Sequence, residues 1–292
     1  MREFSTGARI LKHYFPLMCH LKSRLFRLGQ RRREIYRIDS KIQKIRISEL
    51  GGLRSLQFGE GNTPIQASIS LKNPHYLVLN CSCLMLSALF LNPYPKKILI
   101  IGLGAGVLSR SLAQLLPQAE ITNVEIDPMV AEVAQTYFHF TPTQQQHIVI
   151  DDGRKFIEKA KHENQQYDLI LLDAYDSYYI PLKLMTVEFL QSVKSLLTVD
   201  GVLAANTFSI SKLYDRESAT YSAVFGQFYN LKFKNRIIVA NHYPLPSLET
   251  IRQTAKVLSP HLKPFGLKAK WLANLFTSTP DWDPHAQPLR DT

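Results

Sequence analysis

Short apolar runs and amphipathic stretches alternate from about residue 96 to about residue 240 of this 292-residue chain. The apolar runs are rich in β-branched residues and the longer stretches have helical spacing, a pattern typical of parallel strands joined by helices. We expect strands at residues 97–101, 121–126, 147–150, 167–172, 202–205 and 236–240, with helices between them. The pattern predicts an α/β fold, a doubly wound Rossmann-like sheet with helices on both faces.

A different pattern precedes this domain. Isoleucines alternate with polar residues over residues 44–48, and Gly51 and Gly52 mark a turn. An apolar stretch of helical spacing follows over residues 76–91. Residues 41–95 are therefore predicted to form a small antiparallel β-subdomain followed by a helix.

The two ends of the chain lie outside the regular pattern. Residues 241–292 form a tail with helical spacing near residues 248–258 and 268–276. Residues 1–40 form a basic arm: the first 46 residues hold thirteen Lys and Arg against three acidic residues, and so carry +10 of the total net charge of +11. Apolar side chains interleave with these cations, as in basic amphipathic helices that lie on anionic membrane surfaces.

Three interpretations of the arm stay open: a solvated arm or a helix packed on the domain, a helix on a membrane surface, and an organelle transit peptide. Nucleic-acid binding is not expected, because no module of aromatic and basic residues follows the arm. No apolar run is long enough to span a membrane, and the three cysteines form neither a CxxC pair nor an even-numbered disulfide framework. We expect a cytoplasmic protein, membrane-associated only through the arm, and no metal site.

The candidate chemistry lies where the predicted strands end. The first strand runs into Gly102, Gly104 and Gly106, which let a ligand approach the amino terminus of the following helix. The dinucleotide fingerprint would need its third glycine at Val107, so the spacing favours an S-adenosyl cofactor of the methyltransferase fold over NAD. Glu125 ends the second strand, where a carboxylate can accept hydrogen bonds from both hydroxyls of a ribose.

The third and fourth strands place more carboxylates at the same edge of the sheet. Asp152, followed by Gly153, can accept a hydrogen bond from an adenine amino group, with Asp151 as the alternative. Asp173 and Asp176 follow the fourth strand, where a second substrate must approach. They can attract a cationic amine and accept its proton, because only the neutral amine has a lone pair for attack. The structural alternative for this pair is a turn or a helix cap.

Taken together, these stretches resemble the polyamine aminopropyltransferases, the spermidine synthase-like family. The resemblance covers residues 40–240 and rests on 97–106 (KILIIGLGAG), 124–128 (VEIDP), Asp152 with Gly153, 168–176 (DLILLDAYD), Pro181, Phe189 and 200–203 (DGVL). It implies a methyltransferase-type fold behind an N-terminal β-domain that forms a homodimer. It also implies that Glu125 holds the ribose, that Asp152 holds the adenine and that Asp173 is the base on the attacking amine. Gln66 matches the family's cofactor-contacting glutamine.

Three positions depart from the family pattern. Ala105 stands where the family has an Asp that holds the amino group of decarboxylated S-adenosylmethionine, and Asn80 and Ser82 stand where it has a Tyr and an acidic residue that grip the amine. The adenosine half of the site is thus retained and the amine half is altered. Because no carboxylate at position 105 repels the carboxylate of ordinary S-adenosylmethionine, we expect that this cofactor is no longer excluded.

Three functions follow from these observations. The first is an aminopropyltransferase of polyamine biosynthesis that uses decarboxylated S-adenosylmethionine and a small-molecule amine, with Asp173 and Asp176 as catalytic residues. The second is a methyltransferase that uses S-adenosylmethionine at the same site. The third is a non-catalytic relative that binds an adenosyl ligand.

Overall fold

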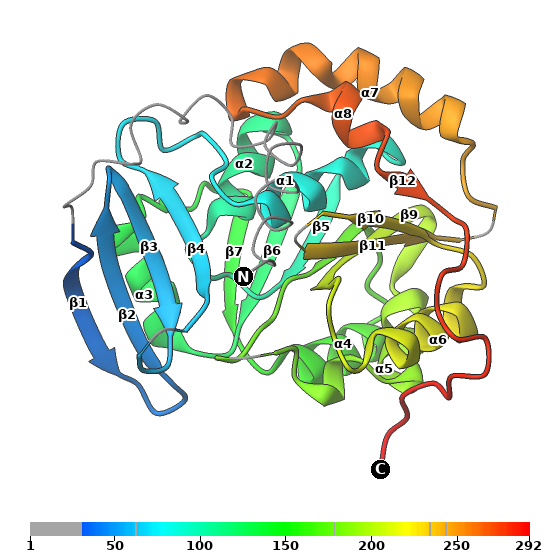
Figure 1. Ribbon diagram of the computed structural model, residues 1–292, viewed down its shortest axis with the longest axis horizontal. Helices are drawn as coiled ribbons and strands as arrows, with labels where there is room; N and C mark the ends of the chain where they lie inside the picture. The colour runs from blue at the N-terminus through cyan, green and yellow to red at the C-terminus, as the bar shows by residue number, and fades with distance from the viewer. Residues whose placement is uncertain (1–30, 62, 178, 234, 243) are drawn as a thin grey trace, which may run out of the picture.

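The computed structural model describes residues 31–61, 63–177, 179–233, 235–242 and 244–292, arranged as two sheets with helices around the larger one (Figure 1). The first 30 residues of the predicted basic arm lie outside the described residues. The three interpretations of the arm therefore stay predictions. Within the described residues, no helix combines the length and the apolar character needed to cross a membrane.

The N-terminal sheet is antiparallel, with the order β1-β2-β3-β4. Its strands are β1 (Arg33–Asp39), β2 (Lys44–Leu50), β3 (Leu53–Phe58) and β4 (Ile65–Ser70). This sheet confirms the predicted β-subdomain, but β1 lies inside the stretch that the sequence assigned to the basic arm. Ile35, Tyr36 and Ile38 pack against the core, while Arg33 and Arg37 form surface ion pairs with glutamates. An edge strand tolerates such charges. Residues 33–39 were predicted to belong to the basic arm, but they form the edge strand of this sheet.

The larger sheet has eight strands in the order β12-β10-β11-β9-β8-β5-β6-β7. Its strands are β5 (Lys97–Ile101), β6 (Glu120–Glu125), β7 (Gln146–Ile150), β8 (Tyr167–Leu172), β9 (Leu197–Phe208), β10 (Tyr229–Lys232), β11 (Asn235–Asn241) and β12 (Phe276–Thr277). All six predicted strands are present, and β5 to β9 are parallel. The predicted strand at residues 236–240 is part of β11, which runs antiparallel to β9, and β10 and β12 continue the sheet antiparallel beyond it.

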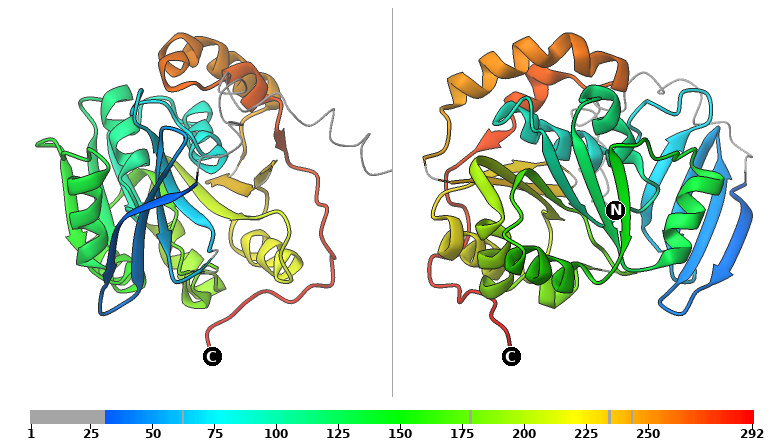
Figure 2. Two further views of the ribbon diagram at one scale, coloured as in Figure 1. Left: turned by 60° about the vertical axis from the view of Figure 1, so that its left-hand side comes forward. Right: turned by 180° about the vertical axis from the view of Figure 1, so that it is seen from behind.

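Alternation along β5 explains why helices cover both faces of this sheet. Ile98 and Ile100 point into one hydrophobic core, while Leu99 and Ile101 point into the other. The first core is completed by α1 (Asn80–Leu86), the 3₁₀ turn η3 (Ser87–Phe90), α2 (Val107–Leu115), α3 (Pro128–Tyr137), α7 (Leu248–Leu262) and α8 (Ala269–Ala273). The second is completed by α4 (Gly153–His162), the 3₁₀ turn η4 (Leu182–Leu184), α5 (Val187–Ser195) and α6 (Tyr214–Phe225). Figures 1 and 2 show these two helical layers on opposite sides of the sheet.

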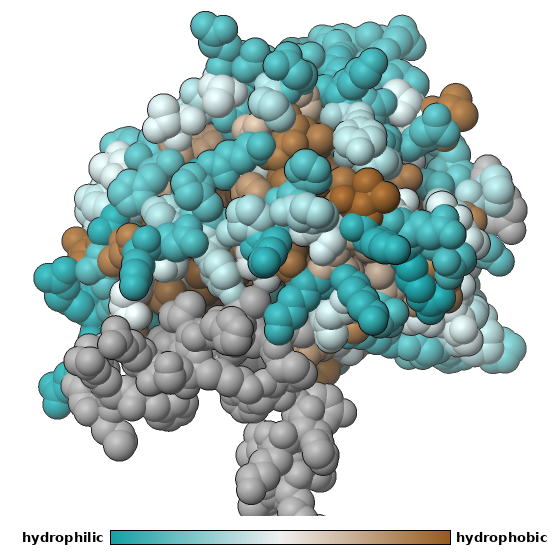
Figure 3. Space-filling model, turned by 90° about the horizontal axis from the view of Figure 1, so that it is seen from above, coloured by the Kyte–Doolittle hydropathy of each residue, from teal (hydrophilic) through white to brown (hydrophobic). Residues whose placement is uncertain are grey.

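The C-terminal tail belongs to the large domain instead of forming a separate unit. Ile251, Ala255 and Leu258 of α7 are buried at helical spacing, and Figure 3, which looks onto this side, shows mainly hydrophilic groups on the outer surface. Strand β12 then pairs with β10, and the last residues run beside α6, where the Leu289 N–H donates to Thr220 Oγ1 at 2.8 Å. The predicted tail helices are therefore confirmed, but the predicted domain boundary at residue 240 divides one sheet.

The predicted helix over residues 76–91 is shorter than expected. It begins only at Asn80, because Leu77 forms an isolated bridge to Ile69 of β4, and its last residues form the 3₁₀ turn η3. This bridge helps to hold the N-terminal sheet against the large domain. A second link joins Ser40 Oγ to Asp127 Oδ2 at 2.5 Å, close to the carboxyl end of β6.

Candidate active site

A cavity of about 340 Å³ lies at the carboxyl ends of β5, β6 and β8 and is closed on one side by the N-terminal sheet. Its volume falls in the range of about 300–1,000 Å³ that is usual for small-molecule sites. Of the predicted site residues, those that line it are Gln66, Gly102, Gly104, Glu125, Asp152, Gly153, Asp173 and Asp176. The fold therefore brings together carboxylates from three strand ends, as expected at this edge of a doubly wound sheet.

The conformation of the glycine loop, residues 102–106, depends on the close approach of the Gly102 backbone to the backbone at Asp173. This residue has a φ of +99°, and a Cβ atom there would lie 2.5 Å from the carbonyl oxygen of Asp173. At Gly104 a Cβ atom would meet nothing within 4 Å, so the cavity is open at this point. Gly106 instead lies against the ring of Phe140 and precedes α2. Gly106 is not among the cavity-lining residues, and its predicted contact with a cofactor stays a prediction.

Glu125 fastens the glycine loop to the end of β6. Its Oε2 accepts a hydrogen bond from the Leu103 N–H at 3.0 Å, and its Oε1 accepts one from the Asp127 N–H at 3.1 Å. The side chain is only 7% exposed, and this burial raises its pKa although the backbone N–H groups oppose the shift. A carboxylate has about four acceptor positions, so Glu125 can still accept hydrogen bonds from a ligand in the cavity.

Asp152 serves as the N-cap of α4 as well as a wall of the cavity. Its Oδ1 accepts from the N–H groups of Arg154 and Lys155 at 2.9 and 3.2 Å, and its Oδ2 forms an ion pair with Lys183. Partial burial raises the pKa of Asp152, but the hydrogen bond from Lys183 and the backbone donors outweigh it and leave the pKa below its usual value. Lys183 also lines the cavity. No local sequence pattern indicates this residue, because it is a single lysine in the short 3₁₀ turn η4.

Asp173 is a partly buried carboxylate at the end of β8. Its Oδ1 accepts a hydrogen bond from Asn206 Nδ2 at 2.8 Å, and its backbone N–H donates to the Ile101 carbonyl at 2.8 Å. Burial raises the pKa of Asp173 to about 6, against the opposing effect of the Asn206 hydrogen bond. The neighbouring thiol of Cys81, on α1, has its pKa raised to about 12 by burial and by the charge of Asp173. With a pKa of about 6, Asp173 is mostly ionised at neutral pH, and its carboxylate can accept a proton.

Asp176 lies at the exposed side of the same loop and is held in a turn. The Tyr179 N–H donates to Asp176 Oδ1 at 2.8 Å, and the Asp176 N–H donates to the Tyr179 carbonyl at 2.9 Å. Gln66 Nε2, from β4, reaches the Asp176 carbonyl at 3.5 Å. The structural alternative of a turn thus describes Asp176 well, whereas Asp173 lines the cavity and is not the N-cap of a described helix.

Two of the three positions that depart from the family pattern line the cavity. Ala105 and Ser82 line it, whereas Asn80 begins α1 without lining it. Ala105 is only 1% exposed, and its methyl group brings no charge to the cavity wall. Among the residues that the structure describes, no group of three His, Cys, Asp or Glu side chains is placed to hold a metal ion.

The sequence of the chain matches a protein family and is similar to individual members of it. Residues 80–246 match the family described as the spermine/spermidine synthase domain. The chain is 46% identical over 210 residues to a polyamine aminopropyltransferase of Vibrio vulnificus, and this match covers 70% of each protein. The matched region contains the glycine loop, Glu125, Asp152, Asp173 and Asp176.

Two solved structures are similar to this fold. A probable spermidine synthase from Corynebacterium glutamicum superimposes with a TM-score of 0.68 at 19% identity, over 88% of this chain and 96% of its own, which is a similarity of fold. Human methyltransferase-like protein 13, solved in complex with SAH, superimposes with a TM-score of 0.56 at 27% identity, over 70% of this chain and 93% of its own. Both kinds of group transfer, of an aminopropyl and of a methyl group, are therefore represented among proteins of this fold.

Proposed function

Because the chain belongs to the spermine/spermidine synthase domain family, we propose that it transfers an aminopropyl group from decarboxylated S-adenosylmethionine to an amine acceptor. The position of Asp173 carries this proposal. Its carboxylate lines the cavity next to the glycine loop, and burial raises its pKa to about 6. Such a group is ionised at neutral pH and is a better proton acceptor than an ordinary aspartate.

The adenosyl part of the donor fits the half of the cavity formed by β5, β6 and β7. Gly104 leaves space for the ligand, and Glu125 accepts hydrogen bonds from the two ribose hydroxyls. Asp152 lies where the adenine amino group can donate to it, with Lys183 bound to the same carboxylate. Gln66, from the N-terminal sheet, covers the donor from the opposite side. The sulfonium centre is then left between the glycine loop and Asp173.

The reaction is a displacement at carbon. The nitrogen of the acceptor attacks the aminopropyl carbon that is bonded to sulfur, so that the new N–C bond forms as the C–S bond breaks. The electron pair of the C–S bond stays on sulfur, and methylthioadenosine leaves. Asp176 attracts the cationic acceptor to the mouth of the cavity, and Asp173 takes the proton that the ammonium must lose so that the neutral nitrogen has a lone pair for attack. Positioning and electrostatic complementarity supply most of the rate.

Methyl transfer from S-adenosylmethionine is a second candidate, and Ala105 favours it. This buried alanine presents no charge to the cavity, so the carboxylate of ordinary S-adenosylmethionine meets no repulsion there. The similarity to a human methyltransferase-like protein solved with SAH points in the same direction. In this function the methyl group leaves sulfur for the acceptor, and S-adenosylhomocysteine is the product.

Thermal unfolding with the two product nucleosides tests both functions. A ligand present at about 100 times its Kd stabilises the folded protein by about 2.7 kcal/mol, which gives a clear rise in Tm. Stronger stabilisation by methylthioadenosine supports aminopropyl transfer, and stronger stabilisation by S-adenosylhomocysteine supports methyl transfer. Incubation with each donor and a panel of diamines, followed by mass spectrometry, then identifies the product. A Tm that neither nucleoside changes contradicts both functions, and binding without turnover indicates the non-catalytic relative.

A further inference from the structure

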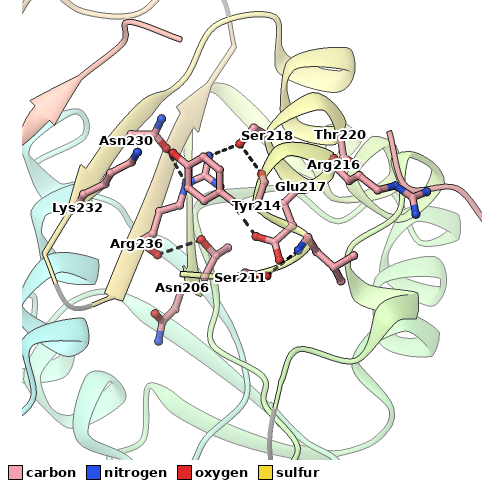
Figure 4. A network of polar contacts seen from close by, with 12 residues as sticks. Asn206, Ser211, Tyr214, Arg216, Glu217, Ser218, Thr220, Asn230, Lys232 and Arg236 are labelled. Carbon is pink, nitrogen blue, oxygen red and sulfur yellow. Dashed lines mark hydrogen bonds and ion pairs between the residues drawn. The ribbon is translucent and has the colours of Figure 1, made fainter. Parts of the chain in front are cut away.

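A buried ion pair lies behind the loop that carries Asp176. Arg236, on β11, and Glu217, on α6, are 0% and 1% exposed, with Arg236 Nη1 3.9 Å from Glu217 Oε2. At this distance the two facing atoms attract each other as charges but form no hydrogen bond, and neither has a hydrogen-bond partner among the described residues. Burying two charges costs more solvation energy than their attraction commonly returns, so such a pair is weak evidence for a purely stabilising role. Figure 4 shows the pair between the sheet and α6.

The Arg236 side chain is fixed on three sides. Its Nε donates to Asn230 Oδ1 at 2.8 Å and its Nη2 donates to Ser218 Oγ at 2.8 Å, while the guanidinium lies over the ring of Tyr214 at 4.2 Å. Burial lowers the pKa of Arg236, and the negatively charged groups around it oppose this. The guanidinium is therefore a rigid cation that keeps the carboxylate of Glu217 in one place.

The other carboxylate oxygen of Glu217 contacts the loop that carries Asp176. Its Oε1 accepts a hydrogen bond from the hydroxyl of Tyr179. The Tyr179 ring is also stacked on Phe208, with centroids 5.1 Å apart and planes 23° apart. Among the described residues, Tyr179 makes two contacts with Asp176 through its own backbone: its N–H donates to the Asp176 carboxylate and its carbonyl accepts from the Asp176 N–H. A continuous chain of contacts therefore runs from the buried ion pair to a carboxylate at the mouth of the cavity.

We propose that Glu217 is a positioning residue for the amine acceptor: it anchors Tyr179, and Tyr179 sets the position of the Asp176 carboxylate at the cavity mouth. The proposal rests on aminopropyl transfer as the function of the site. An apolar side chain in place of Glu217 would fill the same space but would leave the Tyr179 hydroxyl without this acceptor. Burying the charge of Glu217 costs solvation energy, and its role in holding the loop that carries Asp176 explains why the charge is there.

The substitution Tyr179→Phe tests this role, because it deletes the hydroxyl that meets Glu217 and keeps the ring on Phe208. We expect the KM for the amine to rise about tenfold, while kcat and the KM for the nucleoside donor change less than about twofold. Tyr214→Phe is the matched control: it deletes another hydroxyl of the same network, one that donates to Asp281 at 2.6 Å. That control leaves the Glu217–Tyr179 contact intact, so its KM for the amine stays at the wild-type value.

Ser211→Ala separates the two partners of the Tyr179 hydroxyl, because Ser211 Oγ also contacts it. If Glu217 is the anchor, this substitution has less effect on the KM for the amine than Tyr179→Phe has. An equal or greater effect of Ser211→Ala would overturn the assignment to Glu217.

Hydrogen exchange gives a readout that does not depend on turnover. The amides of Asp176 and Tyr179 are the two that the turn protects, and we expect both to exchange about tenfold faster in Tyr179→Phe, while the amides of β5 stay unchanged. Unchanged exchange would overturn the proposal, and so would faster exchange with an unchanged KM for the amine. Faster exchange in a protein whose wild type transfers no aminopropyl group would support the anchoring role and refute the proposed function instead.

Discussion

The cavity has a donor side, at the carboxyl ends of β5, β6 and β7, and an acceptor side, in the loop after β8. The two sides differ in the groups that hold their carboxylates in place. On the donor side, Glu125 and Asp152 accept hydrogen bonds from backbone N–H groups of residues two to twenty-two positions away. On the acceptor side, Asp173 depends on Asn206, and Asp176 depends on Tyr179 and, through it, on Glu217. The donor-side arrangement is mainly a property of the backbone. On the acceptor side, Asp173 is held by a side chain from a distant segment, and the local backbone turn of Asp176 is connected to the distant Glu217 through the side chain of Tyr179.

This difference means that the two halves can change separately. Backbone contacts at the strand ends survive most side-chain substitutions, so the adenosyl site is kept as long as the sheet folds. The acceptor side can be altered by single substitutions. Of the two cavity-lining positions that depart from the family pattern, Ser82 follows Cys81, whose thiol neighbours Asp173, whereas Ala105 lies in the glycine loop on the donor side. Four predictions test whether the halves are as independent as this comparison suggests.

The largest effect is expected from Glu125→Ala. This substitution removes the ribose acceptor and also frees the glycine loop, since Glu125 holds the Leu103 N–H. Hydrogen bonds to a charged group contribute about 1.5–3 kcal/mol each, so affinity for methylthioadenosine should fall by more than about 100-fold in calorimetry. The matched control is Glu120→Ala on the same strand, whose side chain is 52% exposed and lies outside the cavity. Affinity retained within about threefold in Glu125→Ala would refute the donor site.

Asp173→Asn should affect turnover and leave the donor half intact. The amide cannot take the proton of the attacking amine, so kcat should fall by about 100-fold or more, the usual scale of general-base catalysis. Affinity for methylthioadenosine should stay close to that of the wild type. Asp176→Asn is the comparison, and it should act mainly on the KM for the amine. Wild-type turnover in Asp173→Asn would remove this residue from the mechanism.

A smaller effect is expected from pH. Burial raises the pKa of Asp173 to about 6, so the carboxylate takes up a proton at a higher pH than an ordinary aspartate does. Because kcat/KM reports the ionisation of the free enzyme, kcat/KM for the amine should therefore decline as the pH falls through about 6, by about tenfold per pH unit below it. Asn206→Ala removes a hydrogen bond that lowers this pKa, so the decline should move to higher pH. A profile that is flat between pH 5 and 8 would contradict Asp173 as the base.

The same contrast explains what the sequence could and could not predict about the site. Gly102, Glu125 and Asp152 were identifiable because each lies at or just after the end of a strand whose hydrophobic pattern is clear. The partners that complete the acceptor side are remote: Asn206 is 33 residues from Asp173, and Glu217 is 38 residues from Tyr179. No local pattern indicates which distant side chain a carboxylate will meet.

The fold shows the same limit. The parallel strands β5 to β9 were predicted because each runs into a turn and an amphipathic helix. Strands β10 and β12 have four and two residues, too few for an alternating pattern to be recognised. The direction of β11 depends on its short connection from β10, which hydrophobicity alone does not reveal. Strand β1 was missed because the cations of an exposed edge strand are similar to those of the basic arm.

The smallest effect, and the sharpest test of independence, is expected at the glycine loop from Ala105→Asp. Ala105 lines the cavity and is 1% exposed, so an introduced carboxylate would face the donor and not the solvent. It should attract the ammonium of decarboxylated S-adenosylmethionine and repel the carboxylate of ordinary S-adenosylmethionine. We expect the ratio of the two dissociation constants to shift by about tenfold in favour of the decarboxylated form, which corresponds to about 1.4 kcal/mol.

Ala105→Asn separates this charge effect from the cost of filling buried space, because Asn has nearly the same shape as Asp and no charge. Both substitutions should weaken binding of the two donors through crowding, but only Ala105→Asp should change their ratio. Affinity for methylthioadenosine, which carries neither charged group, should be equal in the two variants. An equal shift of the ratio in Ala105→Asn would show that shape controls donor choice. A wild-type protein that already prefers the decarboxylated donor strongly would show that the departure at Ala105 is compensated elsewhere in the cavity.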